Sequence, residues 1–113
     1  MKDNTTAEIV QATKKLLERM VEPNRIATQD IASVIFTATP DLDAAFPAQA
    51  ARELGWQDVA LLCTHEMAVP GSLGKCIRIL LHWNTEKEAG EIIHVYLREA
   101  ESLRSSGNLL ARG

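Results

Sequence analysis

The chain has 113 residues, a length that forms one domain whose core needs no metal or disulfide for stability. Hydrophobic residues make up 46% of the chain and charged residues 24%, which is ordinary for a globular protein. The formal net charge is -3 and the basic residues are scattered, so no nucleic-acid partner is expected, because phosphate binding needs a basic face.

A long amphipathic helix is predicted first, over residues 5–21. Residues of its buried side recur at helical spacing: Ile9, Ala12, Thr13, Leu16, Leu17 and Met20. Thr5 and Glu8 have the separation of a capping box, and Pro23 is expected to close the segment.

A strand and a short helix are predicted next. The run IASVIFTAT at 31–39 is rich in β-branched residues and stops at Pro40, which is typical of a strand buried on both faces. The stretch FPAQAAREL at 46–54 predicts a helix, because Pro47 suits a first turn and Gly55 follows its end.

The second half of the chain predicts three more strands. DVALLCT at 58–64 and KCIRILLHWN at 75–84 are apolar runs separated by a turn-rich segment. The segment after them is ambiguous by period, and we interpret 92–97 as a strand and 98–104 as a short helix. The prediction is an α+β fold over residues 1–113, a mixed β-sheet covered by one long helix, with short additional helices.

The sequence favours a cytoplasmic protein. No apolar run approaches the ~20 residues of a membrane span, and the first residues contain no signal-peptide core. Cys63 and Cys76 lie in apolar surroundings and form no CxxC pair, so reduced thiols are the simplest interpretation. No metal site is expected, because the histidines lack ligand spacing: His65, His82 and His94.

Arg78 is the residue out of place, in the middle of the apolar run at 75–84. Strand alternation places it on one face with Leu80 and His82, opposite Ile77 and its alternate neighbours. A guanidinium does not lose its proton, so it needs an acceptor wherever it is buried. That acceptor is either a structural carboxylate, which is the commoner case, or a bound ligand.

Other polar candidates are weaker when taken alone. Arg52 on the short helix has a solvated helix face as its default, and Glu66 follows a strand directly, where sites form but where surface carboxylates are commoner. Tyr96 is most often a core aromatic in such a run. GxSxG, HExxH and P-loop motifs are absent. The residues support a small anion site and leave the function open.

Three collinear blocks of the chain are familiar: FTATPDLDAAFPAQAARELGW, CTHEMAVPGSLGKCIRI and HVYLREAESLR. Together they resemble the trimeric α/β class of chorismate mutase, which is unrelated in fold to the all-helical mutases. The resemblance runs from about Asn4 to Arg104. It implies a pseudo-α/β-barrel homotrimer with active sites between subunits.

The resemblance also implies a reaction, the pericyclic rearrangement of chorismate to prephenate in aromatic amino-acid biosynthesis, without cofactor, metal or covalent intermediate. Such a reaction needs neither a nucleophile nor a proton shuttle, which agrees with the missing motifs. It needs a site that holds the dianion in a compact conformer and stabilises charge on the ether oxygen.

Site residues follow from the same resemblance by motif position. Arg78 would contact the ether oxygen and a substrate carboxylate, while Glu66 and Cys63 would bind the ring hydroxyl and Tyr96 a carboxylate. A neighbouring subunit would supply another wall and the lining: Phe46, Ala48, Arg52, Leu61, Leu62, Leu103 and Arg104.

The chain departs from the family pattern in three places. The family opens with a strand of the type RGIRGATTV, with a further substrate-binding arginine, where this sequence has residues 1–4. Gln49 stands where some relatives have lysine, and the family's LRPD is LRSS here. An alternative is therefore a trimeric carboxylate-binding or regulatory protein of related shape, with little or no turnover.

Overall fold

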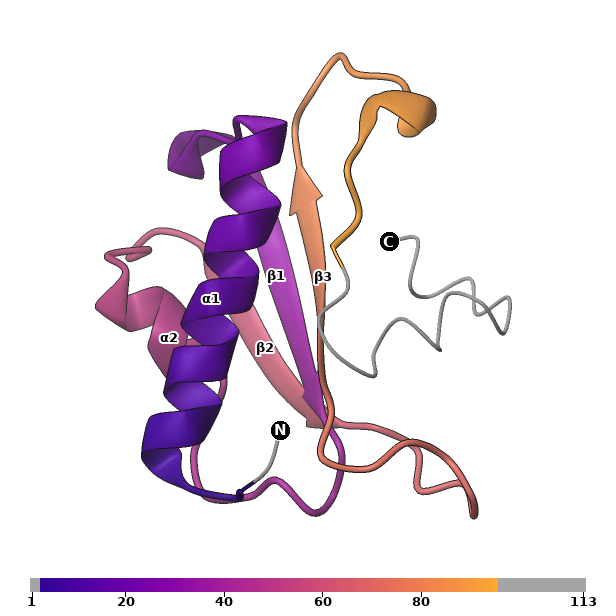
Figure 1. Cartoon of the computed structure of the whole chain (residues 1–113). Helices are drawn as coiled ribbons and strands as arrows, with labels where there is room; N and C mark the ends of the chain where they lie inside the picture. Colours follow the sequence, from indigo (N-terminus) through magenta and orange to yellow (C-terminus); the bar gives the residue numbers. More distant parts are fainter. Residues whose placement is uncertain (1–2, 96–113) are drawn as a thin grey trace.

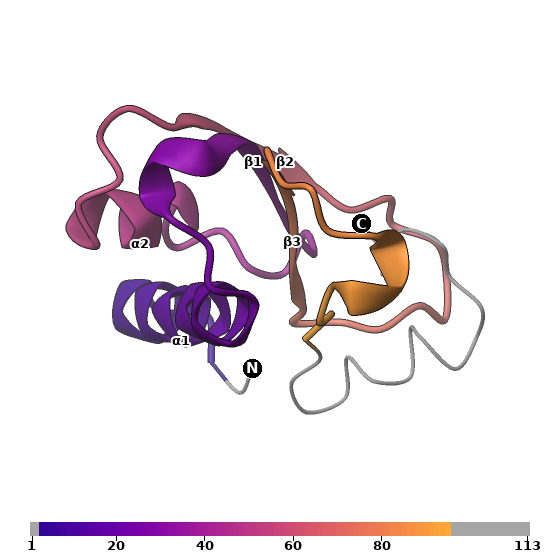
Figure 2. The same cartoon turned by 90° about the horizontal axis from the view of Figure 1, so that it is seen from above.

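The computed structural model describes residues 3–95. The elements along the chain are α1 (Thr6–Asn24), a 3-10 turn (Thr28–Asp30), β1 (Ile31–Ala38), α2 (Ala48–Glu53), β2 (Ala60–His65), β3 (Ile77–Trp83) and a second 3-10 turn (Ala89–Glu91). Both α-helices lie on one side of the sheet (Figures 1 and 2). The predicted α+β fold, with a long helix covering a sheet, is confirmed.

The sheet is mixed and has β1 at its centre. The strand order is β2-β1-β3, with β1 parallel to β2 and antiparallel to β3. The register pairs Thr37 with Thr64 on one side and with Arg78 on the other. Because pairing partners share a face, these three side chains project from the same side of the sheet.

The core fills the space between the helices and one face of the sheet. Its largest fully buried side chains are Phe36, Ile9, Leu17, Leu42, Val34 and Thr13. From β3, the alternate residues Ile79, Leu81 and Trp83 pack against this core. The predicted alternation of β3 is therefore confirmed, and Arg78 belongs to the face that the helices leave uncovered.

The prediction that the first strand is buried on both faces is wrong for this chain. In β1, Val34, Phe36 and Ala38 are buried, whereas Ile35 and Thr37 are only half-buried. Both α-helices cover the same face, so neither of them covers the β-branched residues of the other face. A continuous apolar run fits either case, because the pattern does not say what covers each face.

The first helix is longer than predicted. Thr5 caps it by accepting a hydrogen bond from the Glu8 N–H at 3.1 Å, but the helix continues through Pro23 and ends at Asn24. Pro23 lies in the last turn, where its missing N–H removes only one bond of the helix. Arg25 then ends the helix in the left-handed conformation, with a φ of 54°.

The strand predicted at 92–97 is not formed over its described part, residues 92–95. Ile93 instead exchanges hydrogen bonds with a side chain: its N–H donates to Asn24 Oδ1 at 2.8 Å, and its carbonyl accepts from Asn24 Nδ2 at 2.9 Å. The backbone groups of Ile93 that a strand would use are therefore taken. Residues 96–97 and the predicted helix at 98–104 lie outside the described residues.

Three further predictions concerned membrane spans, metal sites and cysteines. Over residues 3–95, no helix is both long and apolar enough to cross a membrane, and no cluster of three metal-ligating side chains occurs. Cys63 and Cys76 are both free and half-buried.

Candidate active site

Arg78 and Glu66 form an ion pair on the uncovered face of the sheet. The guanidinium Nε donates to Glu66 Oε2 at 2.8 Å, and Nη2 donates to Oε1. The two side chains are 23% and 15% exposed. The structural interpretation of Arg78 therefore holds, since its internal acceptor is Glu66, and the bidentate contact fixes the plane of the guanidinium.

Three strands bring this pair together. Arg78 lies on β3, and Glu66 directly follows β2, where its N–H still pairs with the Ala38 carbonyl of β1 at 2.9 Å. Thr37 lies between them on β1, and its hydroxyl donates to Glu66 Oε2. The site is thus set by the sheet register, which joins residues that are 12 and 29 positions apart in the sequence.

A hydrogen-bonded turn fixes the start of β3. Both carboxylate oxygens of Asp41 accept from the Lys75 N–H at 3.0 Å, and Lys75 has a left-handed φ of 45°. Thr39 adds two bonds to Cys76, one through its N–H and one through its Oγ1, each at 3.0 Å. These hydrogen bonds set where β3 begins, one residue before Arg78.

The electrostatics keep both partners charged. The hydrogen bonds from Arg78 lower the pKa of Glu66 below its usual value of 4.5, against the opposing effect of burial, and the Thr37 hydroxyl lowers it further. The same contact with Glu66 raises the pKa of Arg78. At neutral pH the pair is therefore a carboxylate and a guanidinium.

One donor of Arg78 is left over. Its Nη1 is buried, and among the described residues it has no hydrogen-bond partner. Buried polar atoms are normally satisfied, so an orphaned guanidinium nitrogen indicates a place for an acceptor from outside this part of the chain. Glu66 occupies the Nε and Nη2 side of the guanidinium, so Nη1 faces away from Glu66.

Beside the ion pair, the uncovered face is apolar. The row next to Thr37 and Arg78 consists of Ile35, Leu62 and Leu80, which pair across the sheet. Leu62 is 58% exposed. This surface adjoins the charged pair and would give a ligand or a partner an apolar contact.

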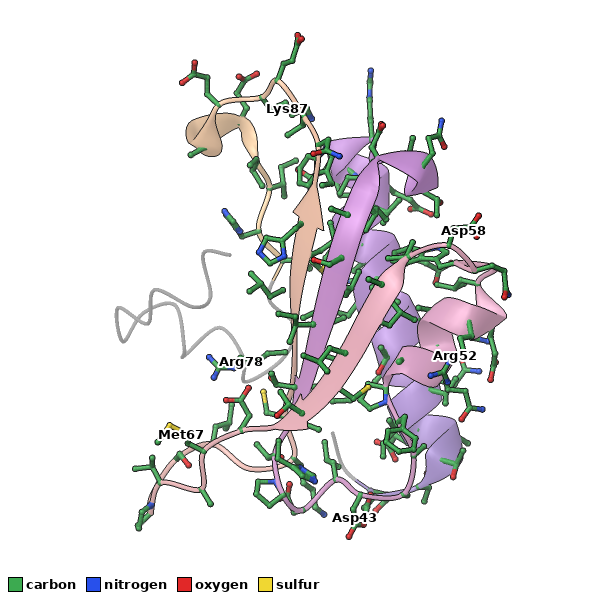
Figure 3. The ribbon with its side chains drawn as sticks, turned by 180° about the vertical axis from the view of Figure 1, so that it is seen from behind. Asp43, Arg52, Asp58, Met67, Arg78 and Lys87 are labelled. Carbon is green, nitrogen blue, oxygen red and sulfur yellow. The ribbon has the colours of Figure 1, made fainter. Side chains whose placement is uncertain are left out.

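The other expected site residues within the described part of the chain do not join Arg78 in one chain. Leu61 and Cys63 of β2 pack on the core side of the sheet, and Ala48 is 2% exposed at the start of α2. Figure 3 shows Arg78 projecting away from the helices, whereas Arg52 lies on α2 on the other side. Phe46, before α2, is 70% exposed. The other expected residues lie outside the described part of the chain: Tyr96, Leu103 and Arg104.

No role was predicted from the sequence for three residues: Thr37, Asp41 and Asn24. Thr37 could be assigned to the site only once the strand register was known, because the register pairs it with Arg78. Asp41 belongs to a turn motif whose hydrogen bonds reach 34 residues along the chain. Such long-range contacts leave no local pattern.

Comparison with known proteins identifies the family. The sequence pattern of chorismate mutase type I matches residues 1–106. The chain belongs to the chorismate mutase type I family.

Individual chorismate mutases are similar over nearly the whole chain. The protein named chorismate mutase AroH of Thermus thermophilus is 49% identical over 105 residues, which cover 92% of this chain and 86% of that protein. The protein of the same name from Bacillus subtilis (strain 168) is 46% identical over 102 residues, 89% of this chain and 80% of that protein. A solved chorismate mutase from Clostridium thermocellum superposes with a TM-score of 0.88 at 56% identity, covering 90% of this chain and 91% of that one.

Proposed function

We propose that this chain rearranges chorismate to prephenate in a site that two neighbouring subunits of a homotrimer complete. Membership of the chorismate mutase type I family supports the reaction. The observation that carries the choice of site is the buried, unpartnered Nη1 of Arg78, held in place by Glu66.

The reaction requires a site that positions the substrate and stabilises the charge that develops in the transition state. A Claisen rearrangement breaks a C–O bond and forms a C–C bond within one molecule, so it needs no nucleophile, proton transfer, cofactor or metal. A millionfold rate gain requires about 8 kcal/mol of transition-state stabilisation beyond that of the ground state. Preorganised donors at the oxygen where charge develops are a sufficient source.

Arg78 is the donor that we assign to that oxygen. Its Nη1 faces away from Glu66 and is available to the ether oxygen and a neighbouring substrate carboxylate. Glu66 has two roles in this proposal, because it orients the guanidinium and offers an acceptor to the ring hydroxyl. The planar fork of arginine suits two oxygens at once.

The second wall comes from a neighbouring subunit. Arg52 and Cys63 are on the opposite side of the sheet from Arg78 in their own chain, so one chain does not assemble the set. A cyclic trimer places that side of one chain against the uncovered face of the next. There the exposed Phe46 and Leu62, with Leu61 and Ala48 beneath them, would add apolar contact.

Residues near the C-terminus complete the proposed site. Tyr96 would bind a substrate carboxylate, and Leu103 and Arg104 would close the C-terminal side. The two free thiols fit a reducing compartment, so we place the enzyme in the cytoplasm.

A carboxylate-binding protein without turnover is the second candidate. One observation favours it: Glu66 already has a structural task in holding Arg78, so its presence in the site does not by itself require catalysis. The same orphaned donor would then serve as an anion anchor.

The deciding experiment adds chorismate to the purified protein and follows prephenate formation, with binding measured in parallel by calorimetry. The mutase proposal expects turnover that saturates with chorismate. Binding without turnover would establish the second candidate. A protein that neither binds chorismate nor turns it over would show that the proposed site is wrong.

A further inference from the structure

Three hydrogen bonds from residues 3–95 reach the carboxylate of Glu66, and they are divided unequally between its oxygens. Oε2 accepts from Arg78 Nε at 2.8 Å and also from Thr37 Oγ1, whereas within this part of the chain Oε1 accepts from Arg78 Nη2 alone. A carboxylate oxygen has two lone pairs in its plane. Oε2 is therefore filled, and Oε1 keeps one position for a further donor.

Thr37 is well placed to impose this division. It lies on the central strand, paired with Arg78 on β3 and with Thr64 on β2, and Glu66 follows β2 two residues after Thr64. A β-branched side chain on a strand has a restricted χ1, so its hydroxyl is held in a fixed direction. The last torsion of a glutamate is soft, and an ion pair alone leaves it free to rock.

We propose that Thr37 is a positioning residue: its hydroxyl locks the Glu66 carboxylate so that Oε1, the oxygen bonded to Arg78 Nη2, is the acceptor left for the substrate. This inference rests on the proposed function. It means that Thr37, which touches no reacting atom, determines which Glu66 oxygen accepts from the substrate. The open position on Oε1 and the Arg78 Nη1, which has no partner among the described residues, would then both be offered to one ligand. A substrate that carries a hydroxyl near an anionic oxygen fits that pairing.

The alternative arrangement shows what the hydroxyl prevents. Without Thr37 Oγ1, Oε2 has an open position toward the sheet, and the carboxylate gains rotations that tilt the guanidinium with it. Arg78 Nη1 would then sample several directions. Since transition-state stabilisation depends on donors fixed in advance, such freedom lowers the rate even when the ion pair survives.

The surroundings leave few other groups to influence the pair. Of the titratable side chains in the described residues, Cys76, directly before β3, acts on Arg78, and His65 adjoins Glu66 in sequence, with its Nδ1 3.2 Å from the Ala38 carbonyl. The pKa of Glu66 is lowered first by Arg78 and then by Thr37, against burial. Removal of the hydroxyl should therefore raise that pKa while Arg78 stays in place.

The test compares Thr37→Val, which keeps the shape and removes the hydroxyl, with Thr37→Ser, which keeps the hydroxyl. Thr64→Val is the matched control, because Thr64 is the strand neighbour on the same face and makes no hydrogen bond to the pair in the described residues. Two quantities are measured: kcat/KM for chorismate, and the pKa of Glu66 from an NMR titration of its carboxyl carbon.

We expect Thr37→Val to lower kcat/KM by about tenfold or more, because a hydrogen bond to a charged group is lost, and to raise the Glu66 pKa. Thr37→Ser and Thr64→Val should stay near wild type in both measurements. Should Thr37→Val fail to fold, Thr37→Ala makes the same comparison.

Several results would overturn the inference. These are a Thr37→Val enzyme equal to wild type, a Thr37→Ser enzyme as impaired as Thr37→Val, or a loss of activity without any change in the Glu66 pKa. If wild-type protein itself has no turnover, the proposed function fails, and the titration alone still decides whether Thr37 holds Glu66.

Discussion

Asn24 and Ile93, 69 residues apart in the sequence, exchange two hydrogen bonds through one side-chain amide. The amide of Asn24 replaces the backbone of a neighbouring strand, accepting from one group of Ile93 and donating to the other. Its Nδ2 also donates to the Met20 carbonyl of α1 at 2.8 Å, and Lys87 Nζ donates to the Asn24 carbonyl at 3.0 Å. The end of α1 therefore fixes the segment that follows β3, three residues before Tyr96.

Asn24→Ala should destabilise the protein. Asn24 is 3% exposed, and the change removes the side-chain partner of both the N–H and the carbonyl of Ile93 in partly buried surroundings. We expect a loss of about 1–3 kcal/mol in the free energy of unfolding, measured by urea denaturation, and faster hydrogen exchange at the Ile93 amide.

Asn84→Ala is the matched control, because Asn84 is exposed and bonds to the Asp30 carbonyl through its backbone N–H at 2.8 Å, which alanine keeps. Its unfolding free energy should stay within about 0.5 kcal/mol of wild type. Equal stabilities for the two variants would show that the Asn24 amide adds nothing to the fold.

Arg78→Ala should lower kcat by at least ~100-fold, the effect of removing one preorganised donor from an oxyanion site. Arg78→Lys should rescue little, because an ammonium cannot keep the bidentate contact with Glu66 and still offer a directed donor. The measurement is steady-state turnover of chorismate. Arg19→Ala removes an exposed arginine from α1 and should leave kcat unchanged. Near-normal turnover of Arg78→Ala would make Arg78 purely structural.

The secondary structure was largely accessible from the sequence. The helical period after Thr5, the apolar runs and the Pro47 turn each act over a few residues, so they predict α1, β1, β2, β3 and α2 to within a few positions. The errors come from contacts beyond that range. Residues 92–95 have strand composition, but Asn24 takes the backbone groups of Ile93.

The site was accessible only in part. Alternation along β3 separates Arg78 from the core residues, yet its partner Glu66 is determined by the parallel pairing of β1 with β2. No periodicity within β3 contains that information. The likeness to the family supplied residue roles, whereas the division of donors between Thr37 and Arg78 required the register.

The stability of the protein should fall at acid pH, in part through Glu66. Its folded pKa lies below the usual 4.5, so the ionised carboxylate adds stability above that value, and the contribution is lost as the pH falls through the folded pKa. Urea denaturation between about pH 7 and pH 3, at one protein concentration, should show this decline. Glu66→Gln should lower stability at neutral pH and weaken its acid dependence.

Glu86→Gln provides the control for that series, since Glu86 is exposed and should keep the wild-type acid slope. Part of the slope should persist in every variant, because the pKa of Asp41 is also lowered, first by its hydrogen bond from Thr39 and then by Lys75. A Glu66→Gln protein with the full wild-type slope would mean that the ion pair does not contribute to stability.

Mixing two inactive variants should restore activity if each site is shared between chains. Arg78→Ala and Arg52→Ala damage opposite sides of the sheet, so a site between an Arg52→Ala chain and an Arg78→Ala chain has one arrangement with both walls intact. Random assembly of equal amounts into cyclic trimers gives that arrangement in about a quarter of the sites. Turnover after joint refolding should therefore approach a quarter of the wild-type value. Arg78→Ala mixed with Glu66→Gln damages the same wall in every chain and should regain nothing. Equal results from the two mixtures would place the complete site within a single chain.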